Sequence, residues 1–166
     1  MIRRCGIALG SNLGDRRQFL REAIAALHGI AVSGEAFLEA PLYRSNPLAC
    51  PAGSPDFLNT VVELAWDGTP HGLLDATRAI EQNLGRTRGT ERNAPRTIDL
   101  DLLYCGDIEC DTADLTLPHP RIAERRFVLQ PLADIRPGLV LPGMTGSVRD
   151  LLGNLLEDGP PLVPCA

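Results

Sequence analysis

The sequence has no lysine: all sixteen of its basic residues are arginine. Schiff-base chemistry and phosphate-binding loops that end in Gly-Lys-Ser/Thr are therefore excluded. Long apolar runs are also missing, so no segment is suited to span a bilayer. The first residues lead into a strand pattern and not into an apolar signal region. We therefore expect a cytoplasmic protein with no membrane partner.

Cysteine is present in an odd number and in no Cys-x-x-Cys pair. Without a signal segment, this pattern predicts reduced thiols and argues against a disulfide framework or a zinc site. No histidine is tied to a cysteine by spacing, which disfavours a catalytic thiol. We interpret the cysteines as small apolar residues of the core. They are Cys5, Cys50, Cys105, Cys110 and Cys165.

The chain length and the average apolar and charged content fit one globular domain, residues 1–166. Alternating or helical apolar patterns follow one another along it, and Gly29 stands where a helix C-cap glycine belongs. The order of elements predicts an α+β, ferredoxin-like fold, an antiparallel sheet with helices packed on one face. The predicted strands cover residues 4–10, 57–66 and 97–105, with an extended region reaching 43, and the helices cover 16–28, 70–84 and 147–156.

Two aspartates, Asp99 and Asp101, alternate with apolar residues in the last long strand. They share one face, with Cα atoms about 6.6 Å apart, while Leu100, Leu102 and Tyr104 are predicted to share the buried face. Paired carboxylates repel each other unless a cation lies between them, and oxygen ligands of this kind suit Mg²⁺. A pair of solvent-facing aspartates is the alternative interpretation.

An arginine-rich loop precedes this pair and favours the metal interpretation. Guanidinium groups beside a dication site are suited to a polyphosphate, since together they neutralise its charge. In the preceding strand, Phe57 and Asn59 share a face, and an aromatic ring beside an amide suits a flat heterocycle. A partly buried Phe and a structural Asn would give the same pattern. The loop arginines are Arg86, Arg88, Arg92 and Arg96.

Five segments together resemble the family of 6-hydroxymethyl-7,8-dihydropterin pyrophosphokinases of folate biosynthesis. The resemblance implies an enzyme that moves the pyrophosphoryl group of ATP onto the hydroxymethyl group of the pterin and releases AMP. The sequence departs from the family pattern at Asn93, where members often carry an aromatic residue. The segments are residues 9–15, 55–59, 85–88, 95–103 and 117–121, followed by Arg125 and Phe127.

The resemblance also implies a role for each matching residue. Two Mg²⁺ ions would be held by Asp99 and Asp101. The transferring group would be stabilised by Arg86 and Arg96. The pterin would be bound by Ser45, Leu48, Phe57, Asn59 and Phe127. ATP would be bound by Glu81, Arg88, Arg92, His119 and Arg125. The expected partners are these small molecules alone, and we expect a monomer.

Three other functions remain open at this point. A nucleotidyltransferase also pairs a Gly-Ser turn with Asp-x-Asp, but Ser11 and Asp99 are far apart in this sequence. A sheet that binds RNA would carry several exposed aromatics and a basic surface, whereas this chain has 4% aromatics and a net charge of −5. The third possibility is a diverged member of the family that acts on another substrate, because Asn93 departs from the family pattern.

Overall fold

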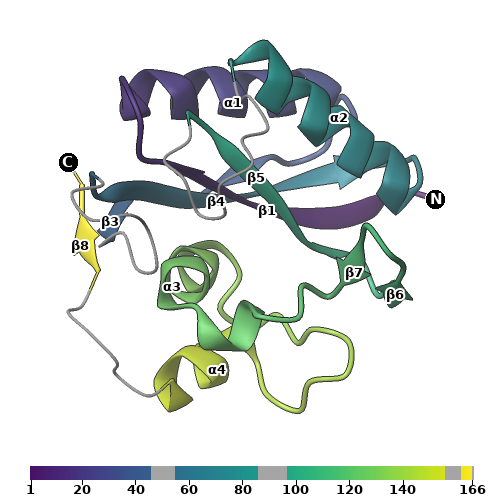
Figure 1. The fold of residues 1–166 in the computed structure, drawn as a ribbon. Coiled ribbons are helices and arrows are strands. Elements are labelled where there is room, and N and C mark those ends of the chain that lie inside the picture. The colour runs from purple at the N-terminus through teal and green to yellow at the C-terminus, as the bar shows by residue number, and fades with distance from the viewer. Residues whose placement is uncertain (46–54, 86–96, 156–161, 166) are drawn as a thin grey trace.

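The computed structural model describes residues 1–45, 55–85, 97–155 and 162–165. A twisted antiparallel sheet lies between two helical layers, as Figure 1 shows. No helix in these ranges is long and apolar enough to cross a membrane. The elements are β1 (Arg3–Ser11), α1 (Arg16–Ile30), β2 (Leu38–Glu39), β3 (Tyr43–Ser45), β4 (Phe57–Trp66), α2 (Pro70–Asn83), β5 (Asp99–Cys105), β6 (Cys110–Asp111), β7 (Thr116–Leu117), the 3₁₀ turn η1 (Ile122–Glu124), α3 (Arg126–Ile135), α4 (Val148–Asn154) and β8 (Val163–Pro164).

Six of the strands within these ranges form the main sheet, in the order β5-β1-β4-β3-β8, with β2 also paired to β4. The central strand β1 is antiparallel to both β4 and β5. This arrangement brings two segments distant in sequence, around residues 59 and 99, to opposite sides of the same strand. The predicted α+β, ferredoxin-like fold is confirmed.

One face of the sheet is covered by α1 and α2. Leucines of both helices pack on alternate residues of β1, β4 and β5, such as Ile7, Val62 and Leu102. Helix α2 begins as predicted: Thr69 caps it by accepting a hydrogen bond from Gly72 N at 3.0 Å, and Pro70 is its first residue.

The predicted C-cap of α1 at Gly29 is wrong. The helix continues to Ile30, and extended Ala31 is the cap residue. The reason lies in the sheet: Val32 N donates to Ala65 O at 3.0 Å, so the chain must leave the helix in an extended conformation just before Val32. Tertiary pairing, which local sequence does not show, fixes this boundary.

The opposite face is covered by α3 and α4, so the prediction of helices on one face only is wrong. Val128, Leu129 and Leu132 of α3 pack on Val61 of β4 and Leu103 of β5. The sequence pattern gave no helix here because the segment is short and contains Pro131. This second layer adjoins the predicted site, because α3 begins beside Asp101.

Tyr104 was predicted to share a face with Leu100 and Leu102, and this is wrong. The register of β5 shifts opposite Gly6 and Ile7, so Leu103 and Tyr104 both lie on the α3 side. Such a bulge interrupts the alternation of side chains. A Cβ atom at Gly6 would lie 2.3 Å from the Tyr104 ring, so only glycine leaves room for it.

Candidate active site

Two of the predicted site residues, Asn59 of β4 and Asp99 of β5, lie in one row across the sheet. Gly10 of β1 pairs with Asn59 on one side and with Asp99 on the other. Since neighbouring strands are about 4.8 Å apart, Asp99 and Asn59 are roughly 10 Å apart with only a glycine between them. Ala8, the next residue of β1 on this face, pairs with Asp101 in the same way. The floor of the site is therefore low and flat.

Gly10 has a steric reason to be glycine. A Cβ atom there would lie 3.3 Å from Asn59 Oδ1 and 3.7 Å from Phe57 Cδ1. The two predicted pterin-binding side chains thus lean over Gly10. The structure therefore adds Gly10 to the predicted site, and the lack of bulk on this face of the strand was the signal in the sequence.

The predicted pterin residues Ser45, Phe57 and Asn59 are brought together by the pairing of β3 with β4. Asn59 is 5% exposed, and its Nδ2 donates to Ser45 Oγ at 2.6 Å. That hydrogen bond fixes the orientation of the amide. Phe127 lies at the start of α3 and packs on the core cluster of this same face.

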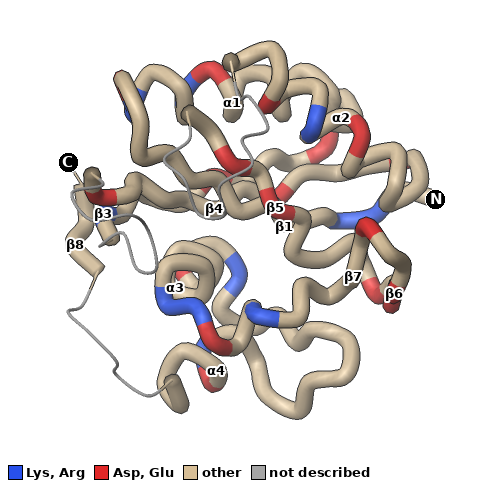
Figure 2. The backbone as a smooth tube through the Cα atoms, viewed as in Figure 1, with Lys and Arg blue, Asp and Glu red and all other residues tan. Residues whose placement is uncertain are grey.

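Arg125 lies close to both Asp101 and the ring of Phe127. Its Nη1 is 3.9 Å from Asp101 Oδ2, and its Cζ is 5.5 Å from the centre of the Phe127 ring. Burial, partly offset by Asp101, lowers the pKa of Arg125, yet a guanidinium stays charged at any physiological pH. Figure 2 shows the same arrangement in outline, with acidic positions along β5 and basic positions at the start of α3.

His119 is held beside the aspartates by its backbone and its ring. His119 N donates to Leu103 O at 2.8 Å, and the ring Nδ1 accepts from Arg121 N at 3.1 Å. Burial is the main cause that lowers the pKa of His119, with the charges of Arg125 and Arg121 adding to it. A neutral ring whose Nδ1 accepts carries its proton on Nε2, which can then donate to a phosphate oxygen.

Glu81 of α2 lies beside the edge strand β5 and is 9% exposed. Its Oε1 accepts a hydrogen bond from Leu100 N at 2.7 Å. Leu100 is the residue between the two aspartates, so Glu81 fixes the backbone that carries both of them. Its predicted contact with ATP stays a prediction.

The remaining predicted residues lie outside the described residues. They are Leu48 in the first gap, and Arg86, Arg88, Arg92 and Arg96 in the second, which also contains Asn93.

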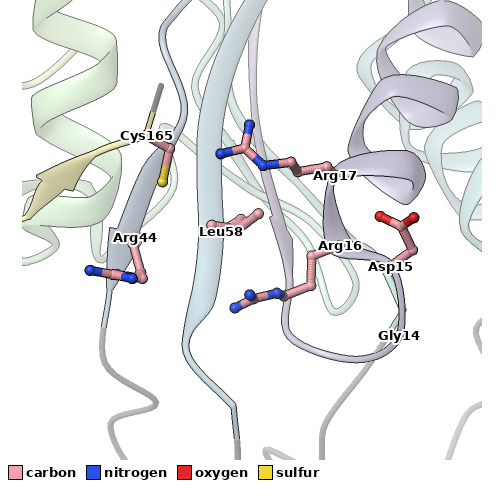
Figure 3. A pocket seen from close by; sticks show the side chains of 7 residues that line it. All are labelled: Gly14, Asp15, Arg16, Arg17, Arg44, Leu58 and Cys165. Atoms are coloured by element: carbon pink, nitrogen blue, oxygen red, sulfur yellow. The ribbon is translucent and has the colours of Figure 1, made fainter.

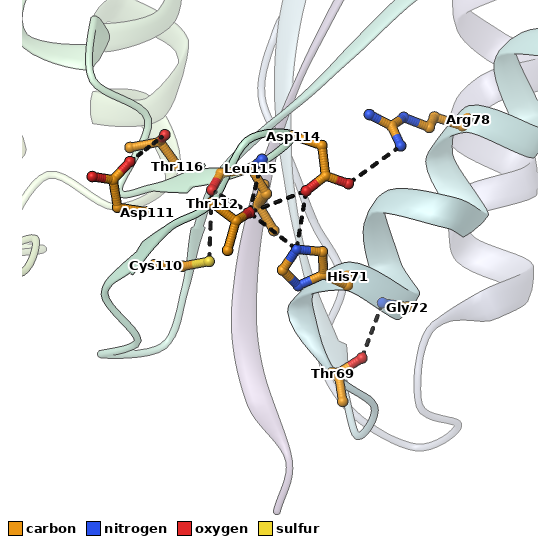
Figure 4. A network of polar contacts seen from close by, with 10 residues as sticks. All are labelled: Thr69, His71, Gly72, Arg78, Cys110, Asp111, Thr112, Asp114, Leu115 and Thr116. Atoms are coloured by element: carbon orange, nitrogen blue, oxygen red, sulfur yellow. Dashed lines mark hydrogen bonds and ion pairs between the residues drawn. The ribbon is translucent and has the colours of Figure 1, made fainter.

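A hairpin formed by β6 and β7 leads directly into His119 and rests on α2 (Figure 4). His71 Nε2 is 3.3 Å from Asp114 Oδ1, and Arg78 Nη1 is 3.7 Å from Asp114 Oδ2. The side-chain hydroxyl of Thr112 lowers the pKa of Asp114, as do contacts with His71. These contacts between exposed side chains place the hairpin on the same helix that carries Glu81.

A cavity of about 260 Å³ lies on the other side of β4 and is shown in Figure 3. Leu58 lines it, and since Leu58 alternates with Phe57 and Asn59, the cavity opens on the α1 face. Arg16 within it donates to Asp56 O at 2.6 Å. It is separated by the sheet from the row of Asp99, Gly10 and Asn59. Its lining residues are Gly14, Asp15, Arg16, Arg17, Arg44, Leu58 and Cys165.

Comparison with known proteins shows the family of this chain. The model of the 7,8-dihydro-6-hydroxymethylpterin-pyrophosphokinase (HPPK) family matches residues 6–137. The chain belongs to this family. The family predicted from the five sequence segments is thereby confirmed, and the row of Asp99, Gly10 and Asn59 lies in the part of the HPPK chain that the family shares.

Several relatives have substantial identity to this chain. The 2-amino-4-hydroxy-6-hydroxymethyldihydropteridine pyrophosphokinase of Bacillus subtilis is 44% identical over 129 residues, which cover 78% of this chain and 75% of the relative. The protein of the same name from Pseudomonas aeruginosa is 43% identical over 142 residues, or 86% of each chain.

A solved structure supports the fold. The crystal structure of Plasmodium falciparum HPPK-DHPS with STZ-DHP matches 92% of this chain with a TM-score of 0.67. The identity is 14%, so this likeness shows the fold alone. This chain spans 41% of that longer chain.

Proposed function

We propose that this protein transfers the pyrophosphoryl group of ATP to 6-hydroxymethyl-7,8-dihydropterin and releases AMP, as a step of folate biosynthesis. The observation that carries the proposal is the single row formed by Asp99, Gly10 and Asn59. It sets the Asp99 carboxylate roughly 10 Å from an oriented amide for a heterocycle, and Asp101 adds a second carboxylate on the same face for a metal-bound polyphosphate. Membership of the HPPK family supports the same reaction.

The pterin would lie over Gly10, between the rings of Phe57 and Phe127. Aromatic stacking suits its flat ring system, and the ring edge would pair with the amide of Asn59. The hydrogen bond from Asn59 to Ser45 supports this, because an amide held in one orientation can discriminate donors from acceptors. Leu48 would complete the pocket, largely through its backbone.

The donor set on β5 fits magnesium. Asp99 and Asp101 supply two carboxylates. A site with three or more His, Cys, Asp or Glu ligands is not found among the described residues. Mg²⁺ is typically bound by one or two carboxylates together with water and phosphate oxygens. When bound, two such ions, held by Asp99 and Asp101, would neutralise the negative charge of the ATP phosphates.

Other side chains of the protein would complete the binding of ATP. Arg125 lies 3.9 Å from Asp101, and His119 lies within range of the Asp99 charge, so both side chains would contact phosphate oxygens. Arg88, Arg92 and Glu81 would bind other parts of the nucleotide. Arg86 and Arg96 would stabilise the transferring group.

The reaction would join the hydroxymethyl oxygen to the β-phosphorus of ATP. The bond between this phosphorus and the oxygen that bridges to the α-phosphorus would break, and AMP would leave with that oxygen. The protein's part is to hold the two substrates in line and to exclude water, which would otherwise compete as the acceptor.

We further propose that residues 1–166 act as one catalytic domain, a monomer in the cytoplasm. Its partners would be the two small-molecule substrates, with no nucleic-acid or membrane partner. Light scattering of the purified protein, with and without substrates, tests the oligomeric state.

The test of function is to incubate the purified protein with ATP, Mg²⁺ and the pterin and to separate the nucleotides. AMP formed in step with a pterin diphosphate is the expected result. Pyrophosphate released in place of AMP would indicate a nucleotidyltransferase and contradict the proposal. ATP that binds but is not consumed would point to a diverged substrate, with the loop at Asn93 as its source.

A further inference from the structure

Two cysteines face each other across the β1–β5 pair. Cys5 and Cys105 are direct register partners, and their Sγ atoms are 2.7 Å apart. Both residues are 0% exposed. The sequence, in which they are a hundred positions apart, suggested only separate core thiols.

Their position in the ladder brings the two backbones close together. Gly106 N donates to Arg4 O at 2.8 Å. A bond from the residue after one partner to the residue before the other marks a non-hydrogen-bonded pair. In antiparallel sheets the Cα atoms of such a pair are about 4.5 Å apart. Disulfides span Cα separations from about 4.4 Å upward, so the strands need not move to accept one.

We propose that Cys5 and Cys105 form a thiol pair that a small peroxide, such as hydrogen peroxide, closes into an intramolecular disulfide joining β1 to β5. This inference does not depend on the proposed function.

The chemistry balances with the peroxide alone. The Cys105 thiolate attacks one peroxide oxygen, the O–O bond breaks, and a sulfenic acid and hydroxide form. Cys5 then attacks Cys105 Sγ, the S–O bond breaks, and the released hydroxide takes up a proton. In sum, two thiols and one hydrogen peroxide give one disulfide and two water molecules.

The surroundings favour Cys105 as the attacking thiol. The hydrogen bond from the Cys5 thiol lowers the pKa of Cys105 against the effect of burial, and the charge of Arg3 adds to this. The same hydrogen bond, together with burial, raises the pKa of Cys5. Cys5 is therefore the thiol that resolves the sulfenic acid.

Access for the oxidant is provided at the strand ends. Cys105 is the last residue of β5, and Cys5 is the third residue of β1, near the 92% exposed Met1. Opening of a strand end costs far less than global unfolding and admits a small neutral molecule. A bulky disulfide such as oxidised glutathione is a poorer reagent for this buried pair.

The bond would form at the opposite end of β5 from Asp99. Among the described strands β5 has only β1 as a partner, so the disulfide would anchor an edge strand. We expect a higher melting temperature, reversed by a thiol reductant.

The test is to treat the folded protein with hydrogen peroxide, remove the peroxide, unfold the protein in denaturant with an alkylating agent that blocks the remaining thiols, and measure the intact mass. The number of blocked thiols should fall by two from the five present. Tryptic digestion should then yield the peptide of residues 5–16 joined to that of residues 97–121.

Three variants make the result specific. C5S and C105S should each lose the joined peptide. C110S is the matched control, because Cys110 lies in the same tryptic peptide as Cys105, and it should keep the link. Five thiols that survive peroxide in the wild-type protein would overturn the proposal, as would a link through Cys110 or a sulfinic acid at Cys105 without a link. The wild-type result decides even if a serine variant fails to fold.

Discussion

Glu81 Oε1 accepts a hydrogen bond from Leu100 N, and so a buried carboxylate on α2 holds the backbone between Asp99 and Asp101. Leu100 N points away from β1, at the edge of the sheet, where an unpaired donor would otherwise be buried. The helix thus positions the strand that carries the predicted metal ligands.

Replacement of Glu81 by alanine should leave Leu100 N without this acceptor and destabilise the protein by about 1–3 kcal/mol. E81Q keeps an acceptor and should recover most of the loss. Urea unfolding without ATP measures this effect apart from nucleotide binding. D75A, at an exposed position of the same helix, is the control and should change stability by less than about 0.5 kcal/mol. Equal stability of E81A and D75A would contradict the role.

Substitution of Gly10 by alanine should weaken pterin binding. The new methyl group would be 3.3 Å from Asn59 Oδ1, so the amide must shift from the position that Ser45 fixes. We expect a KM for the pterin raised by about tenfold, which corresponds to ~1.4 kcal/mol, with the KM for ATP little changed.

The matched control for G10A is G29A. Nothing lies within 4 Å of a Cβ atom at Gly29, which is inside α1, so this change should stabilise the protein by about 0.5–1 kcal/mol. If G10A leaves the pterin KM unchanged, the heterocycle does not lie over Gly10.

Glu63 should make stability dependent on pH. It is fully buried, accepts the Tyr104 hydroxyl, and pairs with Arg4 at 2.9 Å and Arg136 at 2.6 Å. Burial alone would raise the pKa of Glu63, but the hydrogen bonds from Tyr104, Arg4 and Arg136 outweigh it and lower the pKa below the ordinary 4.5.

A carboxyl whose pKa is lower in the folded state stabilises that state above its unfolded pKa. This contribution is lost as the pH falls through the folded pKa. E63Q should therefore lower the free energy of unfolding by about 3–5 kcal/mol at pH 7, as expected when one partner of a buried pair is removed. The difference in free energy of unfolding between E63Q and wild type should become smaller below about pH 4. A difference that stays constant with pH, in unfolding curves run beside those of the exposed control E35Q, would contradict this account.

Asp101 and Arg125 should act together on ATP. Their side chains are 3.9 Å apart, so loss of either changes the charge that the phosphates meet. R125A should raise the KM for ATP and weaken its binding, whereas D101N should lower kcat by about 10²–10³-fold, the size seen when one group that stabilises transition-state charge is removed. Steady-state kinetics over both substrates separates these effects. R149A, on an exposed position of α4, should change neither constant.

The sequence was sufficient to predict which residues share a face wherever the side chains of a strand alternate regularly. Alternation alone placed Phe57 with Asn59 and Asp99 with Asp101, and the structure keeps both pairs on one face because β4 and the start of β5 are regular. It failed at Tyr104, since a bulge depends on the partner strand and reverses the alternation. The sequence pattern also failed to predict α3, because Pro131 is unfavourable inside a helix and this helix is stabilised by tertiary packing. The contact of Glu81 with Leu100 and that of Cys5 with Cys105 join distant segments, which no local pattern can show.

On the α3 face of the sheet, the β- and γ-phosphates of ATP should pass as one group to the pterin. The most direct test is to follow ATP that is radiolabelled at the β-phosphorus in one sample and at the α-phosphorus in another. The β-label should appear in the pterin product and the α-label in AMP, and D99N should abolish the formation of both labelled products while remaining folded. An α-label in the pterin product, or undiminished transfer by D99N, would contradict the account.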